Sequence, residues 1–209
     1  MSLNIPVLDI SQGFSDAVLI KELTHACEEW GFFQIMGHGI DPGLRKKFFK
    51  NVEDFFSLPK SQKLKLSRTK DNFWGYYDKE ITKIKIDSKE IYDIDASPEQ
   101  LILEHPEFEV PWSKDLPELK PTVLEWLTLV ESLSINLLGS ICIALGESSE
   151  TLNPFFLNNH TSFLRFNYYP NLVERSIEEK NDECYLGIHP HTDAGALTVL
   201  AQDTVPGLP

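Results

Sequence analysis

Cysteine is scarce in this chain of 209 residues: there are three, at positions 27, 142 and 184, and no Cys-x-x-Cys motif. An odd number at scattered spacing excludes a regular disulfide framework and favours a reducing compartment. Cys27 and Cys142 lie in segments with helical apolar periodicity, so we expect both thiols to be buried.

Basic residues are also few, with 19 Lys and Arg against 32 Asp and Glu, a formal charge of −13. Nucleic acids and anionic membranes attract basic patches, so neither is expected as a partner. The N-terminus lacks a basic segment followed by an apolar one, and we expect no apolar run of membrane length. The sequence therefore predicts a soluble cytoplasmic protein.

Apolar periodicity predicts one α+β unit with helices first and antiparallel strands afterwards. Asp41 followed by Pro42 is a helix start signal, and Ser57-Leu58-Pro59 ends that helix. Between residues 60 and 115 a basic segment is followed by an acidic one, for which loops and short strands are expected. Helices are predicted for 16–30, 42–57 and 121–146, and strands for 5–10, 31–37, 162–170, 185–193 and 196–203, the last two joined by a turn at Ala194-Gly195.

The stretch HPHTDAGALTVL places His191 and Asp193 two residues apart in a predicted strand. Side chains at i and i+2 of a strand point to the same side, so an imidazole and a carboxylate could bind one ion. Completed by a second His, such a pair is the facial triad of non-haem Fe(II) oxygenases, which leaves coordination positions open.

Other interpretations of this stretch remain open. His191 could be a solvated side chain and Asp193 a turn residue before Gly195. His189, two residues earlier, could join them in a cupin-like His-x-His-x-Asp site, although Pro190 would disturb the ladder. The remaining histidines, at positions 25, 38, 105 and 160, are expected to be structural or solvated.

Three separated parts of the sequence resemble the isopenicillin N synthase-like group of Fe(II)- and 2-oxoglutarate-dependent dioxygenases. IPVLDIS with ACEEWGFFQIMGHGI is similar to the N-terminal region of that group, and DSKEIYDI to an element in its middle. RFNYYP and PHTDAGALTVLAQDTVPGL are similar to the start of its catalytic double-stranded β-helix.

The resemblance implies an N-terminal dioxygenase-type helical region, residues 1–115, packed on an incomplete jelly roll. Residues 116–209 would form the long helix and the first part of this jelly-roll catalytic core. It implies that His191 and Asp193 bind Fe(II), and that Asn167 and Tyr169 line the 2-oxoglutarate pocket. Strand alternation agrees, because Arg165, Asn167 and Tyr169 should share one face. The implied reaction is oxidation of a small organic substrate by O₂, coupled to decarboxylation of 2-oxoglutarate to succinate.

In the resembling group, a second iron-binding His and an Arg for 2-oxoglutarate come after the PGL element. Here no His or Arg follows Asp193, and the sequence ends at Pro209. We therefore expect a C-terminally truncated form, and whether this chain is itself an enzyme stays open. The alternatives are a non-catalytic isoform acting as an interaction protein, a cupin-like metal-binding protein, and an oxidase that needs no 2-oxo acid.

Overall fold

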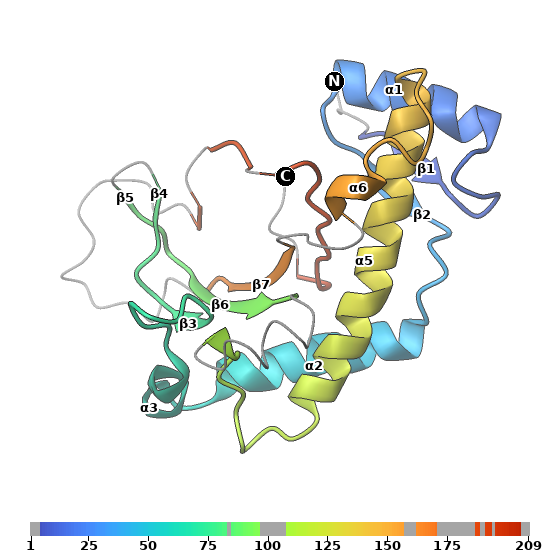
Figure 1. Ribbon diagram of the computed structural model, residues 1–209. Helices are drawn as coiled ribbons and strands as arrows, with labels where there is room; N and C mark the ends of the chain where they lie inside the picture. Colours follow the sequence, from blue (N-terminus) through green and yellow to red (C-terminus); the bar gives the residue numbers. More distant parts are fainter. Residues whose placement is uncertain are drawn as a thin grey trace. The chain divides into compact units, whose positions relative to one another are not determined.

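A computed structural model of the chain describes residues 5–82, 85–96, 108–156, 162–170, 187–188, 191–193 and 195–205. Helices and strands occur together in these residues, which confirms the α+β class (Figure 1). Predictions for Cys184, His105, His160 and His189 lie outside the described residues.

Contacts divide the chain into two compact units. The first contains residues 1–47, 124–160 and 196–209, and the second contains residues 48–123 and 161–195. Each unit contains residues from before and after position 115. The predicted boundary between two domains at that position stays a prediction.

The first unit contains a short parallel strand pair connected by a helix. Its elements are β1 (Val7–Asp9), α1 (Ala17–Glu29), β2 (Gln34–Met36), the start of α2 (Pro42–Ser57), most of α5 (Leu119–Ala144) and α6 (Asn153–Phe156). β1 pairs with β2 in parallel, with Leu8 opposite Ile35. Parallel neighbours need a crossover connection, which α1 supplies.

Helix α1 begins where the sequence predicts it. The Asp16 carboxylate accepts hydrogen bonds from the backbone N–H groups of Val18 and Leu19, both at 3.0 Å, and so caps the helix. Leu19, Leu23 and Ala26 are buried. The prediction that Cys27 is buried is wrong: it is exposed, because one residue beyond Ala26 the helix has turned by about 100° away from the core.

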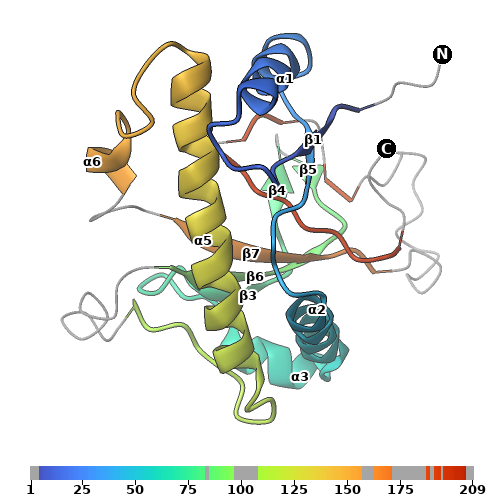
Figure 2. The same ribbon diagram turned by 90° about the vertical axis from the view of Figure 1, so that its right-hand side faces the viewer.

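Helix α5 supplies the other side of the core of the first unit (Figure 2). It starts at Leu119, two residues before the predicted start, and Cys142 near its end is buried as predicted. Gly146 follows with a φ of +81°, the left-handed conformation that commonly ends helices. One apolar cluster is formed by the buried residues Leu8, Ile10, Leu19, Leu23, Leu133 and Leu137.

Among the described residues, α5 is long and apolar enough, by length and composition alone, to cross a membrane. The prediction that no apolar run reaches that length is therefore wrong. The helix is this apolar because its outer face also carries apolar side chains: Leu124 and Leu129 are 44% and 39% exposed. Leu133 and Leu137 nevertheless pack in the core of the first unit.

The second unit is built around a three-stranded antiparallel sheet in the order β3-β6-β7. Its elements are the end of α2, α3 (Lys60–Lys63), the 3-10 turn η1 (Leu64–Leu66), β3 (Gly75–Tyr77), β4 (Ile81–Thr82), β5 (Lys85–Ile86), β6 (Glu90–Asp95) and β7 (Phe163–Tyr168). Asp41 caps α2 as predicted, because its carboxylate accepts a hydrogen bond from the N–H of Leu44 at 2.8 Å.

One face of this sheet packs on α2 through aromatic rings. Tyr76, Tyr92 and Phe166 are opposite one another across the three strands. Phe48 of α2 lies edge-on to Phe166, and Phe55 lies 4.4 Å from the Tyr92 ring between centroids. This aromatic layer is the core of the second unit.

Two predictions about strands need correction. The order of helices before antiparallel strands is wrong, because β3 and β6 precede α5; in the part of the chain that the structure describes, β7 is the strand that follows it. The sequence also predicts a strand over 196–203, but among the described residues this segment has no ladder partner. Its side chains still alternate: Leu197 and Val199 pack against the core of the first unit. A strand is defined by pairing as well as by alternation, and alternation alone does not supply a partner.

Truncation of a core ring should show how much stability the aromatic layer supplies. Phe55→Ala removes a fully buried ring and should lower the free energy of unfolding by about 3–5 kcal/mol. Phe155→Ala is the matched control, because its ring is 68% exposed and its loss should cost less than about 0.5 kcal/mol. Urea unfolding measures both; equal losses would contradict the assignment of this core.

Candidate active site

The face of the sheet opposite the aromatic layer is polar. Side chains alternate between faces along a strand, so Asp93 and Arg165, which are opposite each other in the register, lie on this polar face. Ile91 and Asn167 form the next pair on the same face. The prediction that Arg165 and Asn167 share a face is confirmed by this register.

Two arginines and two carboxylates form an ion-pair cluster on the polar face. Arg165 donates to both carboxylate oxygens of Asp93, at 2.7 and 2.8 Å, and to Glu80 at 3.2 Å. Arg68 lies 3.2 Å from Glu80 and 3.7 Å from Asp93. The Arg68 guanidinium also stacks 3.6 Å from the centroid of the Tyr77 ring. Two positive and two negative charges balance, so the cluster adds no net charge to this face.

Tyr169 follows β7 directly and lies close to the same charges. Burial raises the pKa of its hydroxyl, the nearby Asp87 carboxylate raises this pKa further, and Arg165 lowers it. One side of the ring is covered by Gly187: a Cβ atom built on that glycine would lie 2.6 Å from a ring carbon. Tyr169 is therefore held between the polar face and residue 187, while 49% of the residue stays exposed.

A second ion pair lies at the start of β6. The Lys89 ammonium is 3.4 Å from the Asp87 carboxylate, and the two side chains are 2% and 0% exposed. Both residues belong to the segment DSKEIYDI, which is similar to an element in the middle of the resembling group. That similarity alone assigns no function to either residue. A signal for the pair was available in the sequence, because charges of opposite sign at i and i+2 point to one side of an extended segment.

His191 and Asp193 lie side by side in the second unit. The Nε2 atom of His191 is 3.2 Å from Oδ1 of Asp193, and the side chains are 38% and 59% exposed. Two neighbouring ligands of an octahedral ion, each about 2.1 Å from it, are roughly 3.0 Å apart. The separation and the donor types therefore fit two ligands of one ferrous ion, and they also fit a direct hydrogen bond.

No group of three His, Cys, Asp or Glu side chains suited to a metal ion occurs in the part of the chain that the structure describes. The assignment of His191 and Asp193 as iron ligands, and of Asn167 and Tyr169 as cosubstrate residues, stays a prediction. His38 has a local role, as expected for a structural histidine: its Nδ1 accepts a hydrogen bond from the Ile40 N–H within its own loop.

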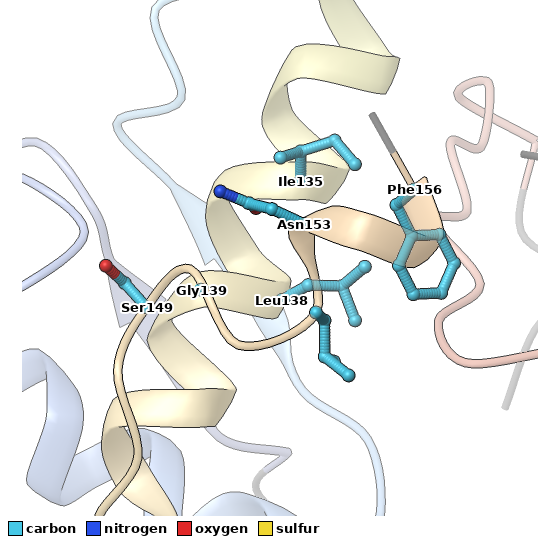
Figure 3. A pocket seen from close by; sticks show the side chains of 7 residues that line it. Ile135, Leu138, Gly139, Ser149, Asn153 and Phe156 are labelled. Atoms are coloured by element: carbon cyan, nitrogen blue, oxygen red, sulfur yellow. The ribbon is translucent and has the colours of Figure 1, made fainter. Parts of the chain in front are cut away.

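A small groove in the first unit is not a candidate active site. Figure 3 shows Ile135 and Leu138 of α5 beside Asn153 and Phe156 of α6. Its walls carry no His, Cys, Asp or Glu, and it leaves no room for a water-sized molecule. We interpret it as imperfect packing between the two helices.

Comparison with known proteins identifies the family. Residues 5–115 match the family described as non-haem dioxygenase in morphine synthesis N-terminal. This match covers more than half of the chain, and the chain belongs to the family of Fe(II)- and 2-oxoglutarate-dependent dioxygenases.

Oxoglutarate-dependent flavonoid 7-O-demethylase 1 of Ocimum basilicum is 28% identical over 205 residues, which are 95% of this chain and 51% of that protein. A full-length Neurospora crassa protein crystallised in complex with alpha-KG is similar with a TM-score of 0.65 and 25% identity, covering 79% of this chain and 54% of that one. JOX2, crystallised with 2OG, Fe and JA, gives a TM-score of 0.67 and 26% identity, covering 80% of this chain and 48% of that one.

The chain thus spans about half the length of the curated relatives it matches. Sequence similarity to these relatives extends over almost all of it, because 95% to 99% of its length aligns. The three separated parts of the resemblance are therefore joined by one continuous similarity.

The ion-pair cluster gives a prediction about stability. Arg165→Met leaves the Asp93 carboxylate, 6% exposed, with the longer contact to Arg68, and should cost about 2–3 kcal/mol in unfolding experiments. Lys50→Met is the control: Lys50 pairs with Glu53 and Asp54 on the exposed surface, so its loss should cost far less than the loss of Arg165. A loss at Arg165 no larger than the control would contradict a cluster that depends on its guanidinium.

Proposed function

We propose that this chain is part of a non-haem Fe(II) oxygenase that oxidises a small organic substrate with O₂ and 2-oxoglutarate. The observation that carries the proposal is the 3.2 Å approach of the His191 imidazole and the Asp193 carboxylate. Membership of the dioxygenase family supports it, as do the similar structures solved with 2-oxoglutarate and iron.

In this proposal His191 and Asp193 hold the iron. A neutral imidazole and a carboxylate bind a ferrous ion and leave other positions free for exchangeable ligands. The iron, when bound, supplies the activation of O₂, which protein side chains alone cannot perform. Both side chains are partly exposed, so an ion could reach them from solvent.

Asn167 and Tyr169 are proposed to hold the cosubstrate. The Asn167 side chain carries amide donors, and the Tyr169 hydroxyl can donate one hydrogen bond; 2-oxoglutarate presents two carboxylates and a ketone that accept them. Asn167 lies on the polar face of the sheet and is exposed. We further propose that the sheet β3-β6-β7 belongs to a double-stranded β-helix, the jelly roll that the resemblance implies.

Iron binding tests this proposal directly. His191→Ala and Asp193→Ala should each weaken Fe(II) binding by at least about a hundredfold, because even outer partners of metal ligands contribute about 10- to 100-fold. The measurement is an anaerobic Fe(II) titration. His25→Ala is the control, since His25 is an exposed residue of α1 and its loss should leave Fe(II) affinity unchanged.

The same titration distinguishes the alternatives. If 2-oxoglutarate produces a metal-to-ligand charge-transfer band, either with this chain or with a C-terminally extended version, the dioxygenase proposal holds. If His189→Ala weakens binding as strongly as His191→Ala, a cupin-like site is favoured. If neither version binds iron, a non-catalytic interaction protein replaces the proposal.

A further inference from the structure

The Tyr169 ring lies against the backbone of Gly187. A Cβ atom built on Gly187 would be 2.6 Å from the Cδ1 atom and 2.8 Å from the Cε1 atom of that ring. Because a Cβ atom lies about 1.5 Å from its own Cα, the Cα of Gly187 is within about 4 Å of the ring. Heavy atoms this close are in van der Waals contact, so the glycine backbone supports one side of the ring.

The backbone conformation does not require a glycine at position 187. Gly13, Gly146 and Gly195 have a positive φ, the left-handed conformation that favours glycine, whereas Gly187 does not. A residue with a side chain could therefore adopt this backbone. It could not leave the ring in place, because two non-bonded carbon atoms are best about 3.5–4.0 Å apart. The space occupied by the Tyr169 ring is thus what demands a glycine.

Gly187 belongs to the segment that leads to the proposed iron ligands. It precedes His191 by four residues, and four residues of chain span at most about 14 Å. Tyr169 directly follows β7. Both residues belong to the second unit. The contact between them therefore joins the segment of the proposed iron ligands to a proposed cosubstrate residue.

The other side of the ring leaves room for movement, since 49% of Tyr169 is exposed. A side chain at position 187 would push the ring toward solvent rather than into packed atoms. The hydroxyl is at the far end of the ring, so a tilt displaces it further than any ring carbon. The placement of the hydroxyl therefore depends on the absence of a side chain at Gly187.

We propose that Gly187 is a positioning residue: its bare backbone fixes the Tyr169 ring, and through it the hydroxyl that binds 2-oxoglutarate. This inference rests on the proposed function for the role of Tyr169. The contact itself is a property of the ligand-free chain and can be tested without iron or cosubstrate.

Gly187→Ala should displace the Tyr169 hydroxyl and weaken 2-oxoglutarate binding by at least about tenfold, because a hydrogen bond to a charged group is lost. Two backgrounds show whether this loss passes through Tyr169. Tyr169→Phe keeps the ring without the hydroxyl, so adding G187A there should weaken 2-oxoglutarate binding by less than about twofold. Tyr169→Ala removes the ring, so it should relieve any loss of stability that Gly187→Ala causes.

Three measurements follow these effects. Aromatic ¹H–¹³C NMR of the ligand-free 209-residue chain, assigned with Tyr169→Phe, should show the Tyr169 ring signals shifted in Gly187→Ala. Urea unfolding of the single and double variants gives the coupling between positions 169 and 187. Anaerobic titration with Fe(II) and then 2-oxoglutarate, on this chain and on a C-terminally extended version, gives the two affinities separately, and Fe(II) affinity should fall less than 2-oxoglutarate affinity.

Gly43→Ala is the matched control. Gly43 also lacks a positive φ, and a Cβ atom there would lie 2.7 Å from Oδ2 of Asp41, the carboxylate that caps α2. Crowding that cap should cost stability. Because Gly43 belongs to the first unit, the Tyr169 ring signals and the 2-oxoglutarate affinity should stay unchanged.

The outcomes separate this inference from the proposed function. Unshifted Tyr169 signals in Gly187→Ala, or a loss of stability with unchanged 2-oxoglutarate affinity, overturn the positioning role. An equal loss of affinity in the Tyr169→Phe background overturns it too. If Gly187→Ala does not fold, recovery in the Tyr169→Ala background supports the contact, and failure there overturns it. A chain that binds neither Fe(II) nor 2-oxoglutarate in either version overturns the proposed function, and with it the cosubstrate part of this inference, while the ligand-free measurements still decide the ring contact.

Discussion

The antiparallel pairing of β6 with β7 is the contact on which the second unit depends. It joins a strand from residues 90–95 to one from 163–168, and its register decides which side chains share a face. Tyr92 opposite Phe166 extends the aromatic layer against α2, and Asp93 opposite Arg165 begins the polar face. Slipping this pairing by one residue would move the charges into the aromatic core.

Charge on the polar face is tolerated because it is paired. Asp93 is nearly buried and is neutralised by the two-pronged contact with Arg165. Asp87, just before β6, is neutralised by a single contact of 3.4 Å with the Lys89 ammonium. A face that is polar, rigid and close to neutral can present hydrogen-bond donors to an anion without repelling it, which a lone carboxylate at the same place would do.

The site residues could be named from the sequence only to a limited extent. The spacing of His191 and Asp193 predicted that they could approach each other, and they do so at 3.2 Å. The ion pairs of Asp93 with Arg165 and Arg68 were not predicted, because these residues are far apart in the sequence and meet only in the folded chain. The i, i+2 spacing of Asp87 and Lys89 was a signal for their pair, but its burial was not predicted. Residues 60–70 look basic in the sequence, yet Lys60, Lys63 and Arg68 are each paired with a carboxylate in the structure.

The sequence by itself determined the local elements. Asp16 and Asp41 with Pro42 fixed two helix starts, Gly146 fixed a helix end, and alternation predicted β7, because caps, turns and periodicity act between residues close in the chain. Tertiary structure alone decided the parallel pairing of β1 with β2, the central place of β6, and the exposure of Cys27. It also decided that residues 195–203 have no ladder partner among the described residues. These outcomes depend on contacts between segments that are far apart in the sequence, and no local sequence pattern encodes such contacts.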